Sequence, residues 1–170
     1  YDDNAANPSA VTRDYVFDVD GEPPLLSVFG GKITTYRKLA EHALQKLKPF
    51  FPAMKGDWTS SAPLPGGEIP GGDFDGFLTR LKRDNGWLPD ALALHLSRLY
   101  GTRASDVING ATSLEGMGQK FGDQLYEAEI IYLRRNEWAE TADDILDRRT
   151  KHRLHLTPEQ QLAVARYIGD

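Results

Sequence analysis

Residues 25–47 read LLSVFGGKITTYRKLAEHALQKL, which is a short apolar run, two glycines and an amphipathic segment. The run at 25–29 has the apolar and aromatic side chains typical of a β-strand, and Gly30-Gly31 interrupts it. After the glycines, apolar side chains recur every three or four residues, as on one face of a helix. These are Ile33, Tyr36, Leu39, Ala40, Ala43, Leu44 and Leu47. The stretch therefore predicts a strand, a tight turn and a helix.

The segment before this stretch holds a second short run, YVFDV at residues 15–19. The turn-forming residues Asp20-Gly-Glu-Pro-Pro24 separate the two runs, so we expect two strands joined by a turn. Thr34 or Thr35 is positioned to cap the helix that follows. Pro49 is expected to end it, because proline disfavours a helical conformation at the residue before it.

The composition changes after this helix. Residues 49–72 hold five prolines and five glycines, too many for regular structure, so we interpret them as a linker or a packed surface loop. Its aromatic residues are expected to pack, since apolar rings gain by burial: Phe50, Phe51 and Trp58. From residue 73 the helical period dominates, and 73–170 predicts an α-helical domain of about five or six helices. The last helix begins at a capping box, Thr157 to Gln160. The predicted fold class is mainly α.

Length and composition limit the possible functions. The 170 residues suffice for one domain, or for one domain with an attached fragment. The formal charge, 20 − 25 = −5, provides no basic field for nucleic acid or an anionic membrane. The absence of cysteine excludes disulfides, thiolate metal ligands and a cysteine nucleophile. No stretch reaches the roughly 20 apolar residues of a membrane-spanning helix. The start, Tyr1-Asp-Asp-Asn, leads us to expect a piece of a longer chain.

The tripeptide Gly30-Gly31-Lys32 is the sharpest local motif. Glycines between a strand and a helix let backbone N–H groups approach a ligand, and the helix start and the lysine both favour an anion. A triphosphate-binding P-loop is excluded, because Leu26 and Ile33 stand where that motif requires glycine and serine or threonine. The residues alone leave two interpretations open: an anion site, or a tight turn with an incidental lysine.

Other polar residues give weaker signals. Arg13 at the entrance of the first strand can clamp a carboxylate or phosphate, or pair with Asp14 at the surface. His42 and His95 are expected to be packed or solvated, and no carboxylate lies at matching spacing around His152-x-x-His155, so we expect no metal site. The basic cluster 148–153 follows three aspartates, which predicts an ion-paired helix end or a domain contact rather than a nucleic-acid patch. Trp138 ahead of it is expected to anchor the helical core.

Several blocks resemble a known family. They are TRDYVFD at 12–18, LLSVFGGKITTYRKLAE at 25–41, LPGG at 64–67, FGxxLYEAE at 121–129 and EWAxxxDDILxRRTK at 137–151. Together they are similar to the C-terminal portion of the bacterial aerobic glycerol-3-phosphate dehydrogenases, and the likeness runs from about residue 8 to 168. By this resemblance, 1–48 is a remnant of the flavin-binding domain, 49–72 a linker and 73–170 the helical C-terminal domain.

The resemblance also implies a chemistry. The family uses FAD to oxidise sn-glycerol 3-phosphate to dihydroxyacetone phosphate and passes the electrons to quinone. It implies that Gly30, Gly31, Lys32, Ile33 and Thr34 contact the flavin, where fixed donors stabilise the negative charge of the reduced ring. Arg13 and Lys32 would bind substrate and stabilise charge. The family further implies a cytoplasmic protein, peripheral on the cytoplasmic membrane, and a possible homodimer without nucleic acid.

The sequence departs from the family in one respect. It contains no Gly-x-Gly-x-x-Gly, the motif that binds the FAD pyrophosphate. We therefore expect the chain alone neither to retain FAD nor to turn over substrate. Two alternatives remain open: the helical domain is a dimerisation or interaction module without chemistry, or the chain is the same portion of an oxygen-using glycerol-3-phosphate oxidase.

Overall fold

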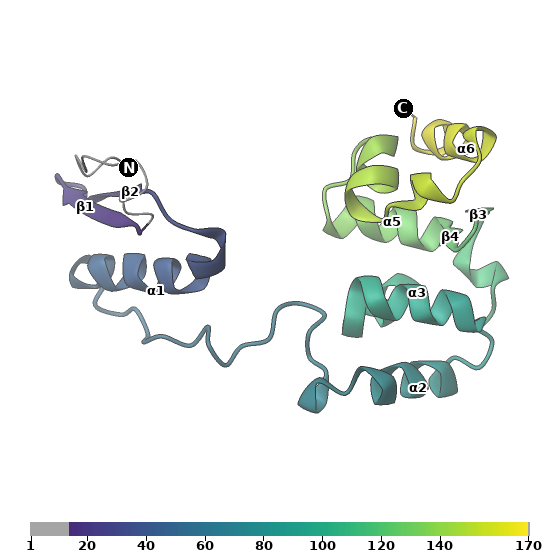
Figure 1. Cartoon of the computed structure of the whole chain (residues 1–170), viewed down its shortest axis with the longest axis horizontal. Coiled ribbons are helices and arrows are strands. Elements are labelled where there is room, and N and C mark those ends of the chain that lie inside the picture. The colour runs from purple at the N-terminus through teal and green to yellow at the C-terminus, as the bar shows by residue number, and fades with distance from the viewer. Residues whose placement is uncertain (1–13, 170) are drawn as a thin grey trace, which may run out of the picture. The chain divides into compact units, whose positions relative to one another are not determined.

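The computed structural model describes residues 14–169, which divide into two compact units. The first unit extends to Ala62, and the second begins at Pro63. Figure 1 shows a hairpin with one helix in the first unit and a set of helices in the second. The structure is mainly helical, which confirms the predicted fold class. None of the helices in the described part combines the length and the apolar character needed to cross a bilayer.

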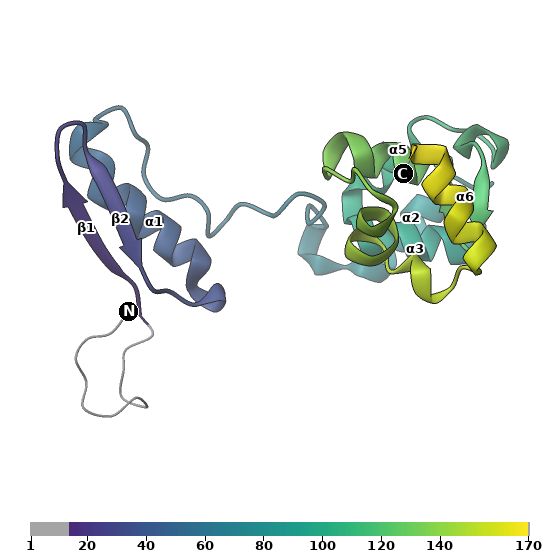
Figure 2. The ribbon, with the colours of Figure 1, turned by 90° about the horizontal axis from the view of Figure 1, so that it is seen from above.

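The first unit is a β-hairpin packed on one helix. Strands β1 (Val16–Asp20) and β2 (Leu25–Phe29) pair antiparallel, with Val16 opposite Phe29 and Asp20 opposite Leu25. A short 3-10 turn, Ile33–Thr35, leads into α1 (Tyr36–Leu47), and the hairpin lies along this helix in Figure 2. Both predicted strands and the predicted helix are therefore confirmed.

The caps of α1 differ in part from the prediction. Thr35 is at the N-cap position, but its side chain makes no capping bond, because its hydroxyl instead donates to the Lys32 carbonyl oxygen at 3.1 Å. At the other end, Pro49 lies inside a 3-10 turn, Lys48–Phe50, which ends the helix as expected. The predicted threonine cap was wrong, and the predicted end is confirmed.

Little of the first unit is buried. Glu41 is the only fully buried residue among the described residues up to Ala62. The rings of Phe50, Phe51 and Trp58 are all exposed, so the expectation that they are packed was wrong. One helix on a two-stranded hairpin offers too little surface to cover them, and such hairpins are at best marginal by themselves.

The second unit has a continuous apolar core. Its helices are α2 (Phe74–Asp84), α3 (Asp90–Tyr100), α4 (Ala104–Ile108), α5 (Glu127–Asn136) and α6 (Pro158–Ile168). A short antiparallel pair, β3 (Lys120–Gly122) and β4 (Leu125–Tyr126), and a π-helical turn, Asp144–Arg149, complete it. The largest fully buried side chains include Leu92, Leu96, Met117, Leu125, Ile130, Leu133, Ile145 and Leu146.

Local chemistry explains most of these helix ends. Thr157 and Gln160 form the predicted capping box of α6, which is confirmed. The predicted ion-paired helix end at 148–153 is also confirmed, since Arg148 pairs with Asp144 at 2.9 Å and Arg153 with Asp147 at 2.7 Å. Trp138, in contrast, is 84% exposed, so its predicted role in the core was wrong. It has a positive φ of 51°, and Ala139 and Ile145 are buried beyond it.

Two glycines allow a close backbone crossing in this unit. Gly66 has φ +88°, and a Cβ there would lie 2.4 Å from the carbonyl oxygen of Tyr100 at the end of α3. Gly101 has φ +55°, and a Cβ there would lie 2.0 Å from the Gly66 carbonyl oxygen. The same oxygen accepts a hydrogen bond from Thr102 N at 2.9 Å. The segment before α2 is therefore fastened to the end of α3 where no side chain fits.

This crossing predicts a difference between two glycine substitutions in the same unit. Gly71 also has a positive φ, +65°, but no atom within 4 Å would meet its Cβ. We expect Gly71→Ala to cost about 1–2 kcal/mol from left-handed strain alone. Gly66→Ala should cost about 1–3 kcal/mol more, because the backbone of α3 must also move. Urea unfolding followed by far-UV circular dichroism measures both; equal losses would contradict the packing described here.

Candidate functional site

The Gly-Gly-Lys turn lies between β2 and the helical segment that begins at Ile33. Gly30 and Gly31 have φ values of +77° and +115°, in the region that favours glycine, while Lys32 is extended. A Cβ on Gly31 would lie 2.8 Å from Leu39 Cδ1, the end of a flexible side chain that can move aside, so the φ angle rather than this contact requires glycine. The positive φ angles explain why two glycines end the strand.

The side chains of this turn face solvent. Ile33 is 89% exposed, and Thr34 is exposed beside it. The Lys32 ammonium lies 3.5 Å from the Asp14 carboxylate, and both side chains are accessible to water, so this pair contributes little to stability. Gly30 to Thr34, the predicted cofactor-contacting residues, thus form one continuous exposed surface. The predicted substrate residue Arg13 lies outside the described residues.

A charged cluster holds α1 against the following loop. The buried Glu41 carboxylate accepts hydrogen bonds from Arg37 at 2.9 Å, from Lys38 at 2.8 Å and from the Thr59 hydroxyl. The bonds from Lys38 and Thr59 lower the pKa of Glu41 to about 2. Sequence reasoning missed this cluster, although the three- and four-residue spacing of Lys38 and Arg37 from Glu41 was a readable signal.

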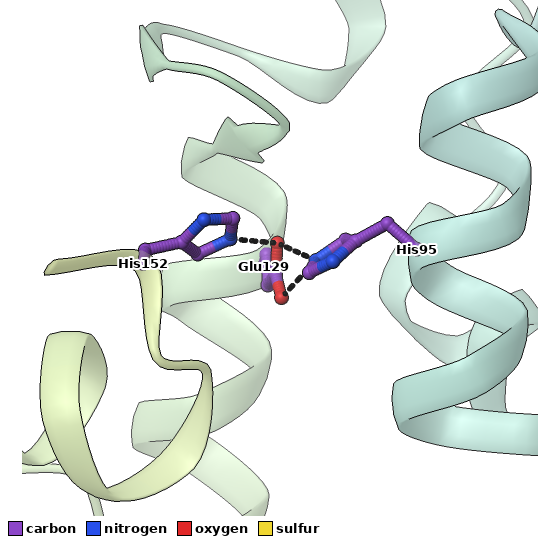
Figure 3. Close-up of side chains that lie close together, drawn as sticks. All are labelled: His95, Glu129 and His152. Carbon is purple, nitrogen blue, oxygen red and sulfur yellow. Dashed lines mark hydrogen bonds and ion pairs between the residues drawn. The ribbon is translucent and has the colours of Figure 1, made fainter. Parts of the chain in front are cut away.

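A second buried carboxylate lies in the helical unit, where three elements meet (Figure 3). Glu129 of α5 accepts a hydrogen bond from Tyr100 of α3 at 2.7 Å, and His95 Nε2 lies 2.8 and 3.1 Å from its two oxygens. His152, in the 3-10 turn His152–Leu154, faces the same carboxylate. Burial raises the pKa of Glu129, but the two imidazoles outweigh it and hold the pKa at about 2.

The environment of His95 follows from the same contacts. Burial lowers the pKa of His95, but the hydrogen bond and charge of Glu129 more than offset this, so the pKa is raised.

His152 is 2% exposed, whereas His155 is exposed, so these two histidines do not face one site. Sequence reasoning considered only neighbours along the chain and missed this cluster. Folding brings Glu129 to His95 across 34 positions of the sequence, and His152 to His95 across 57 positions.

The Glu41 cluster predicts a specific pH dependence. Because its pKa is depressed, the carboxylate stabilises the contact with Thr59 above about pH 4.5, and this contribution is lost as the pH falls toward 2. In Lys38→Met we expect the pKa of Glu41 to move up toward 4.5, since Lys38 is the largest cause of the depression. Lys46→Met, on the exposed side of α1, is the matched control. A carboxyl ¹³C titration measures the midpoint, and an unchanged midpoint in Lys38→Met would refute the assignment.

Comparison with known proteins places the chain in a family. Residues 58–170 match the model of the C-terminal domain of alpha-glycerophosphate oxidase. The D-erythritol 1-phosphate dehydrogenase of Brucella abortus is 55% identical over 100% of this chain and 34% of its own length. The aerobic glycerol-3-phosphate dehydrogenase of Escherichia coli is 45% identical over 98% of this chain and 34% of its own. The alpha-glycerophosphate oxidase of Streptococcus pneumoniae is 35% identical over 88% and 25%.

These relatives agree with the resemblance that the sequence blocks indicated. The chain spans about a third of the length of the first two relatives. The family match covers more than half of the chain and includes the whole described helical unit from Pro63 onward. The protein therefore belongs to the family of the C-terminal domain of alpha-glycerophosphate oxidase.

Proposed function

We propose that this chain is the C-terminal part of an FAD-dependent dehydrogenase that oxidises sn-glycerol 3-phosphate to dihydroxyacetone phosphate and passes electrons to quinone. The observation that carries the proposal is the likeness to the aerobic glycerol-3-phosphate dehydrogenase of Escherichia coli over 98% of the chain. The glycerol-3-phosphate dehydrogenase of Pseudomonas aeruginosa is 46% identical over the same share of the chain. Each relative is about three times longer than this chain, so the activity is assigned to the larger enzyme.

In this proposal the Gly-Gly-Lys turn contacts the flavin. FAD, when bound, accepts the hydride from the substrate. The residues of this chain fit the electron-rich edge of such a ring: two glycines bring the backbone close, and the Lys32 ammonium is accessible at the surface. Gly30, Gly31, Ile33 and Thr34 would contact the cofactor, and Lys32 would contact cofactor and substrate. Arg13 would bind the substrate phosphate or hydroxyls through bidentate hydrogen bonds.

The first unit has a surface that supports its assignment to a flavin domain. Several apolar side chains of its strands, 3-10 turn and helix are exposed, among them Leu25, Phe29, Ile33, Tyr36 and Leu44. A hairpin and one helix leave these side chains in water, and the rest of a flavin domain would cover them. We therefore assign 1–48 to that domain, 49–72 to a linker and 73–170 to a helical domain. The larger enzyme would be cytoplasmic, peripheral on the membrane, and dimeric through the helical domain.

A second substrate is favoured by a specific comparison. The relative that is 55% identical over the whole chain is named for D-erythritol 1-phosphate. Glycerol 3-phosphate and D-erythritol 1-phosphate are both monophosphates of small polyols, so a cation that binds the phosphate serves either. The electron acceptor is a separate question, because the Streptococcus pneumoniae relative is named an oxidase. Initial rates of the complete enzyme with each substrate, under quinone and under oxygen, separate these choices.

Substitution of Lys32 in the complete enzyme tests the role of the turn. Lys32→Met removes the positive charge while keeping the length of the side chain. We expect kcat/KM to fall about tenfold or more, and the flavin potential to fall, because the reduced flavin anion loses a stabilising charge. Lys46→Met on α1 is the control and should leave both unchanged. Normal turnover and an unshifted potential in Lys32→Met would refute the assignment of the turn to the flavin.

A further inference from the structure

A buried group of donor atoms in the helical unit is not used by the proposed flavin chemistry. We propose that His95, Glu129 and His152 bind a divalent transition-metal ion, with Zn²⁺ as the best match. The three residues come from α3, α5 and the turn at 152–154, and their donor atoms lie within 4.8 Å of one another (Figure 3). Two imidazoles and one carboxylate are a ligand set that zinc commonly takes, with a fourth position for water.

The unsatisfied ring nitrogen of His152 is a second observation that supports a metal ion at this site. Its Nε2 is buried and has no hydrogen-bond partner among the described residues, although it points at the Glu129 carboxylate. The separation between Nε2 and Oε2 is 3.7 Å, which is longer than a hydrogen bond. A buried polar atom without a partner costs about 1–3 kcal/mol. A cation between the imidazole and the carboxylate would satisfy both groups.

Neighbouring groups are arranged as partners of the ligands. The Tyr100 hydroxyl donates to Glu129 Oε1 at 2.7 Å, which leaves Oε2 on the side of His152. On the other side of the His152 ring, Nδ1 lies 3.8 Å from the Asp123 carboxylate. In zinc sites a carboxylate commonly orients a ligating histidine through the ring nitrogen that does not bind the metal. At 3.8 Å this contact is also longer than a hydrogen bond, so Asp123 would orient the ring in this way only after a small shift of the two side chains.

The donor atoms lie within 4.8 Å of one another and would have to move to reach the spacing of zinc ligands. Zn–N and Zn–O lengths of about 2.0–2.1 Å place neighbouring tetrahedral ligands about 3.3 Å apart. His95 Nε2 lies 2.8 Å from Glu129 Oε1, so this pair must open slightly, while His152 must approach the carboxylate. The ion would replace the proton that now joins His95 to Glu129.

The site has a route from solvent. The His95 side chain is partly accessible, and it lines a surface hollow together with Asp123, Gln124 and Thr150. Glu129 and His152 are buried and do not line this hollow, so an ion would have to pass the His95 ring to reach them, and water in the hollow would supply the remaining ligand. Bound metal would fasten α3, α5 and the turn at 152–154 to one another. The proposal concerns the helical unit alone and does not depend on the flavin assignment.

Zinc binding to the 170-residue chain tests the proposal. After treatment with EDTA and its removal, the protein is titrated with ZnSO₄ by calorimetry. We expect one Zn²⁺ per chain and, by X-ray absorption, two imidazole nitrogens at about 2.0–2.1 Å. His152→Gln and His95→Gln should each weaken binding about tenfold or more. His155→Gln, which changes an exposed histidine three positions away, should bind as the parent does.

Each outcome decides for or against the site. Thermal unfolding with and without Zn²⁺ should show stabilisation of the parent and of His155→Gln, and a smaller effect in the two cluster variants. Circular dichroism identifies a variant that fails to fold. In that case the X-ray absorption spectrum of the zinc-loaded parent still shows how many imidazole nitrogens bind the ion. No binding to the parent, binding that His152→Gln leaves unchanged, or a spectrum without two imidazoles would overturn the proposal and leave the cluster as a proton-bridged ion pair.

Discussion

The Glu129 carboxylate lies inside the helical unit with 1% of its surface exposed, so its charge must be compensated by protein groups. Those groups come from elsewhere in the chain: His95 and Tyr100 from α3, and His152 from the turn after the π-helical segment. Because α5 is otherwise packed through apolar side chains such as Ile130 and Leu133, the charge fixes which faces of the neighbouring elements turn toward it. The contacts of Glu129 thus join α5 to α3 and to the turn at 152–154, in addition to the apolar core.

The two units differ in how they are stabilised. The helical unit encloses a continuous apolar core, whereas the only fully buried residue in the described part of the first unit is a glutamate. That glutamate, Glu41, joins α1 to the loop at Thr59 through hydrogen bonds rather than apolar contact. The exposed strands and the exposed turn are what a segment of a larger flavin domain would present before its neighbours cover it. The proposed flavin chemistry thus belongs to the first unit, which has no apolar core among its described residues.

The sequence predicted the features that local chemistry determines. The hairpin, the glycine turn, Pro49 and the Thr157–Gln160 capping box all follow from residues close together in the chain. It failed where the outcome depends on distant neighbours. Trp138 and the rings at Phe50 and Phe51 were expected to be buried, but no segment within residues 14–169 covers them.

The candidate sites also differ in whether local sequence or distant neighbours determine them. The exposed turn from Gly30 to Thr34 was readable because its residues are consecutive, while its role toward a flavin stays a prediction. The His95, Glu129 and His152 cluster was not readable, because helical packing alone brings these residues together. Strands β3 and β4 were also missed, since runs of three and two residues carry no usable period.

Glu129 and its partners on α3 stabilise the helical unit as one energetically coupled group. A double-mutant cycle with Glu129→Gln and His95→Gln in metal-free protein measures this most directly, with urea unfolding as the readout. We expect that the two losses are not additive, with an interaction of about 1.5–3 kcal/mol, as for a buried hydrogen bond between charged groups. Losses that add to within about 0.5 kcal/mol would contradict it, because the two side chains would then stabilise the unit independently.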